Sequence, residues 1–417
     1  MGAGTAQGGA CLLISGKVRK NMEFVVFAGV LLLLFIFMIV QELIQTKNQE
    51  KLFKKYLREN YGKEPPKEYS LERFARLGSY LERHKEEKQL DDITWNDLGM
   101  DEVFRRIDRT YSAAGEEYLY YTLRNISCGR EALEHLEEVV NWLQEQENIK
   151  VRIQLLMKRL GHLGKYSLYD YLDNLDYLGE RSNRKIVLGN LLYLPFLLLL
   201  FVQPAMGTIG IVLCMLWHIM TYFREKKVIE PYIISFAYVL RLIDVCEELE
   251  KQKIPVYRRE LDELREALKS LRELRRGSYW VMAGNQGKIG GNPLDILADY
   301  LRMILHLDIF QFNRMLEKLR KKTGQVETML AITGYLDMAI SVGGFRKSLE
   351  GYCIPKLEED TEKAFLHMKK GWHPLLSQPV KNSIRADRGI LLTGSNASGK
   401  STFLKMVAVN AVLAQTI

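Results

Sequence analysis

The chain has 417 residues, of which 47% are apolar and 26% carry a charge, a composition typical of about two to four folded domains. A fully disordered or collagen-like protein is therefore excluded. The 59 basic residues exceed the 51 acidic ones by eight, which suits a nucleic acid or an anionic membrane surface without choosing between them. No two of the five cysteines have zinc-ligand or redox-motif spacing, so neither a disulfide scaffold nor a cysteine zinc site is expected.

An apolar segment without a polar side chain extends over residues 24–40 and follows an N-terminal tail, residues 1–23. As a helix it would cover about 25 Å, which is marginally enough to cross a bilayer. A cleaved signal peptide is the alternative, but Gln41, Glu42 and a lysine-rich stretch follow at once, without a small-x-small cleavage sequence. We therefore predict an uncleaved transmembrane helix and, over residues 41–94, a cytoplasmic helical linker.

A second apolar segment, residues 186–223, contains no Asp, Glu, Lys or Arg. As a helix it would span about 57 Å, close to two bilayer crossings of about 30 Å each. Gln203 and Pro204 lie at its middle, and proline cannot continue a helix without losing a hydrogen bond. The pattern predicts a transmembrane helical hairpin with arms over 186–202 and 205–223. A long buried helix of a soluble protein is the alternative.

A hairpin returns the chain to its starting side, so the regions before and after it would share one compartment. Basic residues flank both arms, as the positive-inside rule expects of a cytoplasmic face: Arg181, Arg184, Lys185, Arg224, Lys226 and Lys227. We expect a multi-pass cell-membrane protein with cytoplasmic soluble domains and an external N-terminus. Three basic residues between 17 and 20 oppose this orientation, unless translation begins at Met22. His218, near the end of the second arm, is expected to be an interfacial side chain rather than a metal ligand.

The remaining sequence has mostly helical periodicity. A stripe of leucines at three- and four-residue steps crosses a charged segment: Leu261, Leu264, Leu268, Leu271 and Leu274. Residues 101–160 and 293–350 show similar spacing, so the predicted fold class is mostly α. Strand character appears only at Ile390, Leu391 and Leu392, a short apolar run typical of a buried parallel strand.

Directly after this run, residues 394–401 read GSNASGKS and fit the phosphate-loop pattern G-x-x-x-x-G-K-[ST] at every fixed position. The two glycines leave backbone N–H groups free to close around phosphate oxygens. Lys400 is expected against the β- and γ-phosphates of ATP, and Ser401 as a ligand of Mg²⁺. Residues 402–415 contain neither Gly nor Pro and can form the helix whose N-terminus receives the phosphates. A glycine-rich turn without a ligand is the alternative.

The nucleotide-binding residues predicted from this pattern are Gly394, Ser395, Asn396, Ala397, Ser398, Gly399, Lys400, Ser401 and Thr402.

Residues 389–405, GILLTGSNASGKSTFLK, resemble two related groups, the ABC-type ATPases and the MutS family of DNA mismatch-repair ATPases, which both favour Asn at the position of Asn396. Upstream residues favour the second group. Residues 107–124, IDRTYSAAGEEYLYYTLR, resemble the opening of the MutS core domain, and residues 131–143, EALEHLEEVVNWL, resemble its next helix. The positions that carry the first resemblance are Asp108, Arg109, Thr110, Ser112, Gly115, Leu119 and Leu123.

Closer to the loop, residues 371–374, GWHP, resemble the entry to the MutS ATPase domain. Residues 380–383, VKNS, resemble the stretch that contacts adenine, which implies adenine contacts for Val380 and Asn382. The resemblance covers about residues 95–417 and implies double-stranded DNA as a partner and a homodimer around ATP in the full-length form. The implied order is a first core segment, the hairpin, a second segment of core and lever, and a P-loop α/β ATPase domain, at residues 95–185, 186–223, 224–370 and 371–417.

The chain also departs from the family. MutS proteins that read mismatches carry a Phe-x-Glu wedge in an N-terminal domain, and the first 94 residues contain no such sequence, so direct mismatch reading is not expected. The hairpin lies where the family carries its DNA clamp, which suggests a bilayer in place of DNA. Ile417 follows the phosphate-loop helix without the acidic strand and signature segment of the family. We expect a truncated ATPase domain that is poorly stabilised over about its last 40 residues and does not hydrolyse ATP alone.

Three functions remain open from the sequence. The first is a membrane-anchored MutS-like ATPase that couples ATP to DNA, and the second is a membrane P-loop ATPase of transporter or regulatory type without DNA. The third is an inert truncated product. Basic stretches at 320–322 and 272–276 could contact DNA phosphates, although charged, solvated helix faces would give the same pattern.

Overall fold

The computed structural model describes residues 37–38, 40–41, 44–64, 69, 71–86, 88–126, 129–163, 167–275, 293–358, 365–395 and 398–417. The chain divides into two compact units, Met1–Asn60 and Tyr61–Ile417. In the first unit, residues 44–60 are helical. Phe37, Met38 and Val40, which end the first predicted membrane span, are helical and exposed, whereas residues 24–36 and 39 lie outside the described residues.

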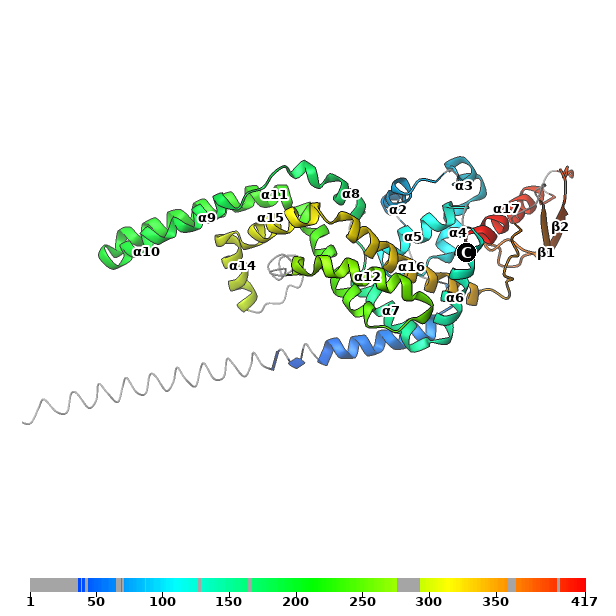
Figure 1. Cartoon of the computed structure of the whole chain (residues 1–417), viewed down its shortest axis with the longest axis horizontal. Coiled ribbons are helices and arrows are strands. Elements are labelled where there is room, and N and C mark those ends of the chain that lie inside the picture. The colour runs from blue at the N-terminus through cyan, green and yellow to red at the C-terminus, as the bar shows by residue number, and fades with distance from the viewer. Residues whose placement is uncertain are drawn as a thin grey trace, which may run out of the picture. The chain divides into compact units, whose positions relative to one another are not determined.

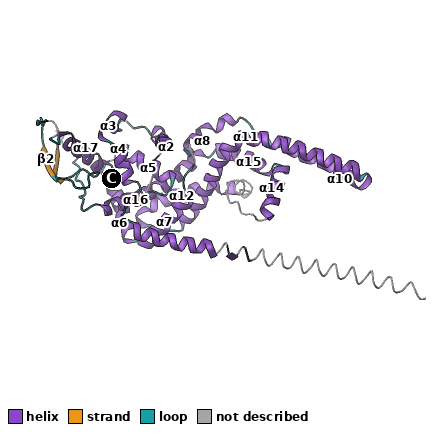
Figure 2. Ribbon diagram, turned by 180° about the vertical axis from the view of Figure 1, so that it is seen from behind, coloured by secondary structure: helices purple, strands orange, loops and turns teal. Residues whose placement is uncertain are grey.

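The second unit is built almost entirely of helices, which confirms the mostly α fold class (Figures 1 and 2). Its elements up to the hairpin turn are α2 (Leu71–Arg83), α3 (Asp92–Leu98), α4 (Met100–Ile107), α5 (Ala113–Arg124), α6 (Arg130–Glu145), α7 (Glu147–Leu160), α8 (Leu168–Asp173), η1 (Asn174–Leu178), α9 (Arg184–Leu191) and α10 (Tyr193–Val202). The following elements are α11 (Pro204–Glu250), η2 (Pro255–Tyr257), α12 (Arg258–Leu271), η3 (Arg272–Arg275), α14 (Pro293–Leu305), α15 (Leu307–Arg320), α16 (Thr323–Ser348), β1 (Leu366–Gly371), β2 (Asn382–Ala386) and α17 (Lys400–Thr416).

Helix α16 is the central element of the core of this unit. It packs against α5, α12, α6 and α7, and most of its residues are buried. By length and composition it could cross a membrane, but its apolar surface is covered by the protein itself. Gly334 permits a close approach of the two backbones, since a Cβ there would lie 2.6 Å from the carbonyl oxygen of Ala114 on α5.

Asp337 ties α16 to the loop that precedes α5. Its carboxylate is 1% exposed and accepts hydrogen bonds from the N–H of Tyr111 at 3.0 Å, the N–H of Ser112 at 2.8 Å and the hydroxyl of Ser112 at 2.6 Å. The same Ser112 oxygen caps α5 by accepting from the N–H of Gly115 at 3.0 Å. A Cβ on Gly115 would lie 2.4 Å from the carboxylate, so this contact requires glycine.

The neighbouring Asp-Arg-Thr triplet also holds the backbone. Asp108 accepts from the N–H of Thr110 at 2.9 Å and its hydroxyl at 2.6 Å, and the Tyr69 hydroxyl donates to the same carboxyl group. Arg109 donates from its guanidinium to the carbonyls of Arg106 at 2.8 Å and Ile107 at 3.0 Å, which closes the end of α4. The motif that resembles the opening of the MutS core therefore builds the fold.

Helices α9, α10 and α11 form the hairpin, and α10 lies alongside α11 (Figures 1 and 2). The turn falls at Gln203, and Pro204 opens α11, where its fixed φ and missing N–H suit the first helical position. The break between α9 and α10 at Leu192 has a similar cause. Pro195 has no N–H to donate to the carbonyl of Leu191, four residues earlier.

Small residues let the two arms pack closely. A Cβ on Gly207 would lie 2.6 Å from the backbone nitrogen of Leu200, and one on Gly210 would lie 2.0 Å from a ring carbon of Phe196. The opposite faces are open: large apolar side chains, such as Phe201 at 90% exposure, stand uncovered along both arms. Exposed apolar surface of this extent marks an interaction with lipid or protein.

The second arm does not end at Phe223 as expected, because α11 continues to Glu250. The charged residues 224–227 interrupt the apolar pattern, but Arg, Glu and Lys are good helix formers. Beyond them most apolar side chains of α11 are buried, among them Ile229, Phe236 and Ile243, and the helix packs on α7, α12 and α15. One helix thus runs from the hairpin into the core.

Strands β1 and β2 form an antiparallel pair in which Leu366 is opposite Ala386. The prediction of a buried parallel strand at Ile390, Leu391 and Leu392 is wrong: these residues are not a strand, and Leu391 is 88% exposed. A parallel strand needs neighbours that satisfy its N–H and C=O groups. Among the described residues, β1 pairs only with β2, so this run finds no such neighbour.

Glu117 of α5 is a buried carboxyl group, 3% exposed, that accepts a hydrogen bond from the Ser167 hydroxyl at 2.9 Å. Burial raises the pKa of Glu117 to about 8, although the Ser167 hydrogen bond opposes the shift. The group is therefore mainly protonated in the folded protein at neutral pH.

The Glu117→Gln variant should remove a pH dependence of stability. Because the folded pKa is raised, Glu117 favours folding below its unfolded pKa of about 4.3, and this contribution is lost as pH rises through 8. Thermal unfolding of the purified protein should show a stability gain of the variant that grows from pH 5 to pH 8, by up to several kcal/mol. Glu138→Gln, at an exposed position of α6, is the control and should show no such trend. A constant difference between Glu117→Gln and wild type across this range would contradict the prediction.

Candidate phosphate-binding loop and hairpin base

The phosphate-loop sequence ends in a left-handed glycine that starts a helix. Gly399 has φ +84° and is the N-cap of α17, and its carbonyl accepts the N–H of Phe403 at 2.9 Å. A residue with a Cβ is strained in this conformation, which explains the glycine. The helix expected over residues 402–415 is confirmed. Asn396 and Ala397, two of the predicted binding residues, lie outside the described residues.

Lys400 folds back over the loop. Its ammonium group donates hydrogen bonds to the carbonyl oxygens of Gly394 and Ser395, so the structure brings these three predicted residues together. Ser401 and Thr402 stand exposed in the first turn of α17. An anion at this helix end would meet the ammonium group, free backbone N–H groups and the positive end of the helix dipole.

The two predicted adenine contacts lie at the start of β2. Asn382 donates from its side chain to the carbonyl of Val380 at 3.0 Å, and Val380 is 78% exposed. The link from this region to α17 runs through other residues: the side chain of Asn410 donates to the carbonyl of Trp372 at 2.8 Å. The structure thus connects the GWHP segment to the phosphate-loop helix through a contact that the sequence pattern did not indicate.

Helix α17 is anchored to the rest of the second unit. Met406, Val409 and Val412 are buried, and the helix packs against α5, α3 and β1. Next to it, His373 is nearly buried, and burial, with a smaller effect of Lys405, lowers the pKa of His373. The candidate site therefore stands on an anchored helix, while the expected weak stability of the last 40 or so residues stays a prediction.

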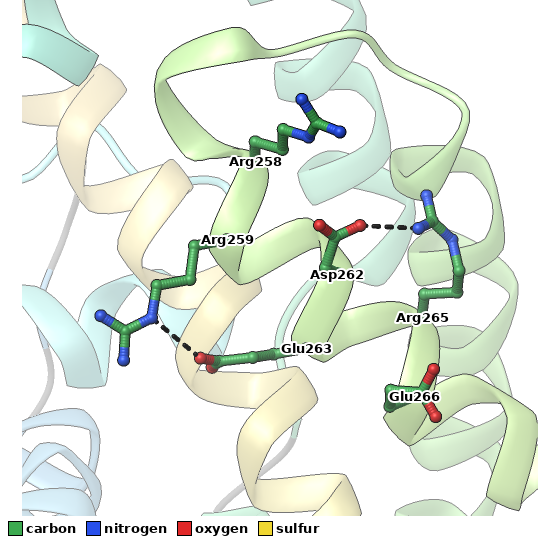
Figure 3. A pocket seen from close by; sticks show the side chains of 6 residues that line it. All are labelled: Arg258, Arg259, Asp262, Glu263, Arg265 and Glu266. Atoms are coloured by element: carbon green, nitrogen blue, oxygen red, sulfur yellow. Dashed lines mark hydrogen bonds and ion pairs between the residues drawn. The ribbon is translucent and has the colours of Figure 1, made fainter.

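A shallow hollow on α12 is formed by charged side chains (Figure 3): Arg258, Arg259, Asp262, Glu263, Arg265 and Glu266. Arg265 pairs with Asp262 at 2.6 Å and with Glu250 at 2.8 Å, and Arg259 pairs with Glu263 at 3.4 Å. These pairs balance the charge and are typical of a solvated helix face. We assign no ligand to this hollow.

The basic stretch at 320–322 is used largely for packing. Arg320 donates to the carbonyls of Leu175 at 2.7 Å and Gly179 at 2.9 Å, and the Lys322 ammonium donates to the carbonyl of Ser270. These contacts account for the Arg320 and Lys322 side chains without a DNA partner. The other stretch is described only to Arg275, within η3.

The base of the hairpin is joined to the end of α14. His218, from α11, is 1% exposed and its Nδ1 bonds to the carbonyl of Ile304 at 2.8 Å. Asn190, from α9, donates to the carbonyl of Leu305 at 3.1 Å. Side chains from both arms thus cap the last carbonyls of α14. The sequence did not indicate this burial of His218, because the burial depends on which helix packs there.

No metal centre is present at this junction in the described part of the chain, where no three histidine, cysteine or acidic side chains converge. The ring of His306 lies 5.1 Å from that of His218. Burial, with a smaller effect of His218, lowers the pKa of His306 to about 4. His306 is therefore neutral at physiological pH.

A Phe-x-Glu tripeptide occurs at Phe223–Glu225, inside α11 and far from the N-terminal position that a mismatch wedge would take. Its Glu225 is paired with Arg181, whose Nε also donates to Asn313 at 3.1 Å. This carboxylate therefore holds the hairpin base.

Comparisons with known proteins agree with the motifs. No family model matches the chain. It is 28% identical to the human MutS protein homolog 4 over 123 residues, which are 28% of this chain and 12% of that protein. It is 33% identical to the DNA mismatch repair protein MutS of Acholeplasma laidlawii over 110 residues, 25% of this chain and 13% of that protein. The MutS protein of Pelotomaculum thermopropionicum is 33% identical over 137 residues, 28% of this chain and 15% of that protein.

These matches confirm the resemblance to the MutS family over about a quarter of the chain. The chain spans only about an eighth of the length of these relatives.

Proposed function

We propose that the protein is a membrane-anchored, MutS-related protein that binds ATP with Mg²⁺ through residues 394–402. One observation carries the nucleotide-binding claim. The left-handed Gly399 starts α17 directly after the loop and sets the Lys400 ammonium over the Gly394 and Ser395 carbonyls, beside the exposed hydroxyl of Ser401.

Each group has a chemical role in this proposal. The ammonium of Lys400 would leave the loop carbonyls to bind the β- and γ-phosphates, and backbone N–H groups at the start of α17 would bind the remaining oxygens. The Ser401 hydroxyl would complete the coordination of Mg²⁺. Hydrolysis also requires a carboxylate that orients metal and water, and we assign no residue of this chain to that role. The proposal is therefore for binding.

Lys400→Met should weaken the binding of a fluorescent ATP analogue at least about tenfold, because one charge-assisted contact to phosphate is worth more than about 1.4 kcal/mol. Fluorescence anisotropy of the detergent-solubilised protein measures this. Lys405→Met removes an exposed lysine from the same helix and should leave the affinity unchanged. Removal of Mg²⁺ should weaken binding by wild type more than by Ser401→Ala. Equal affinities of Lys400→Met and wild type would exclude the site.

The membrane location in this proposal rests on the hairpin. Its arms, α9 with α10 and the first turns of α11, have the length and hydropathy of membrane spans and are mostly uncovered. In a bilayer these side chains would contact acyl chains instead of water. The basic residues that flank both arms favour a cytoplasmic position for the rest of the second unit, so we propose a multi-pass location in the cell membrane.

Trp217 is a reporter for insertion, since it is half exposed on the hairpin surface. After reconstitution of the full chain into phosphatidylcholine bilayers, acyl-chain-brominated lipid should quench its fluorescence. The quenched fraction should largely disappear in Trp217→Phe and persist in Trp142→Phe, which removes a tryptophan of α6. Identical quenching of the two variants would place the hairpin outside the bilayer.

For the partner, two candidates are distinguished by different observations. Two of the relatives are named DNA mismatch repair proteins, which supports DNA as the partner. The double-stranded form of this DNA, and a homodimer that couples it to ATP, are part of our proposal. Helix α11, which runs from the hairpin into the core without a loop, instead favours a regulatory or transporter-type machine that moves its hairpin without DNA. We propose the DNA-linked function and keep the second as its alternative.

DNA binding should depend steeply on salt. For about four phosphate contacts, the affinity for a short duplex should fall roughly a hundredfold between 50 and 200 mM salt, because each contact releases counterions. Anisotropy of a labelled duplex with the solubilised protein measures the slope. Absence of binding at 50 mM salt, with ATP binding intact, would favour the DNA-free alternative.

A further inference from the structure

The hairpin base has a defined level at which the two arms meet the rest of the protein. On the apolar side, a Cβ on Gly189 would lie 3.2 Å from the ring of His218, so α9 and α11 touch there. On the other side, Arg181 forms an ion pair with Glu225. These two contacts bracket about two helical turns of α11 and the first turn and a half of α9.

Four basic residues lie between these two contacts or within about one turn of them, two on each arm: Arg184, Lys185, Arg224 and Lys227. We call them the basic collar. All four are exposed. Within the described part of the chain, no ion pair involves any of them. Nearby cations are engaged: Arg181 holds Glu225 and Asn313, and Lys226 stands 5.3 Å from the ring centroid of Tyr222.

Helix stability does not explain the collar. Arg184 and Lys185 occupy the first turn of α9, where no acidic residue stands, and the dipole of a helix disfavours cations at its N-terminus. Arg224 and Lys227 lie in the interior of α11, far from either of its ends, where the dipole has little effect. Helix stability therefore gives no reason for charges at these four positions.

The position of the collar at the edge of an apolar surface indicates which partner would bind it. On the hairpin side of the collar, the surface becomes apolar at once, with Val187, Leu188, Met220 and Phe223 exposed. Charge followed directly by apolar surface matches an anionic headgroup layer followed by acyl chains. The junction also fixes the collar relative to α14 and α15, since Tyr222 donates to Asp308 at 2.7 Å.

We infer that the basic collar binds the headgroups of anionic phospholipids in the leaflet through which the hairpin enters. This inference rests on the proposed membrane hairpin and adds a lipid class to it. Guanidinium and ammonium groups can bind the headgroup phosphates, and lipids with net negative charge are favoured over phosphatidylcholine, whose own cation offsets its phosphate.

The test uses the full chain in bilayers of 70% phosphatidylcholine and 30% phosphatidylglycerol. In one preparation only phosphatidylglycerol is brominated on its acyl chains, and in the other only phosphatidylcholine. After correction for composition, quenching of Trp217 by phosphatidylglycerol should exceed that by phosphatidylcholine about fivefold, the ratio for one basic side chain at an anionic surface.

The collar variant replaces all four residues by glutamine: Arg184→Gln, Lys185→Gln, Arg224→Gln and Lys227→Gln. Its quenching ratio should fall to about one. The matched control loses the same charge on the exposed face of α12 and should keep the wild-type ratio: Arg258→Gln, Arg259→Gln, Arg265→Gln and Lys269→Gln.

The outcomes distinguish the membrane hairpin from the lipid preference of the collar. Quenching by neither lipid in wild type would overturn the membrane hairpin itself. Equal quenching by both lipids would leave the hairpin in place and overturn the lipid preference. A preference that survives in the collar variant, or is lost equally in the α12 control, would assign it to groups other than the collar.

Discussion

The buried carboxylate of Asp337 is the contact on which the second unit depends. It accepts hydrogen bonds from Ser112, which lies 225 residues earlier, and so holds α16 against α5. The sequence between these two helices includes the hairpin. A buried carboxylate without hydrogen-bond donors would be strongly destabilising, whereas three donors at 2.6 to 3.0 Å compensate its desolvation. Because Gly115 and Gly334 admit no side chain, this closure has one register.

Helix α11, which contains Pro231 in its interior, then joins two environments in one element. Its first turns expose apolar side chains, and its last turns are buried among α7, α12 and α15. No loop separates the two, but Pro231 removes one hydrogen bond of the helix between them. A displacement of the hairpin would reach the core through this helix. The caps that Asn190 and His218 place on α14 add a second attachment at the same level.

Local patterns predicted those features whose causes are local. The turn at Gln203 follows from one proline, and the start of α17 follows from the glycine of the phosphate loop. The end of α11 was missed because residues 224–227 interrupt hydropathy but not helix formation. The burial of His218 and the pairing of β1 with β2 depend on segments distant in sequence. The exposure of Leu391 shows the same limit, since an apolar run becomes a strand only where neighbours accept its hydrogen bonds.

The two groups of MutS-like motifs differ in what the structure does with them. Asp108, Arg109 and Ser112 hold the backbone in place, so these motif residues support the architecture of the core. Within the described residues, Lys400 instead donates to carbonyls of its own loop, from which a ligand could displace it. A path of packed helices, α17 to α5, α5 to α16 and α16 to α11, connects that loop to the hairpin. The Asp337 contact lies in the middle of this path. Any effect of ATP on the hairpin would therefore require these helices to move together, because repacking α5 against α16 would leave the carboxylate unpaired.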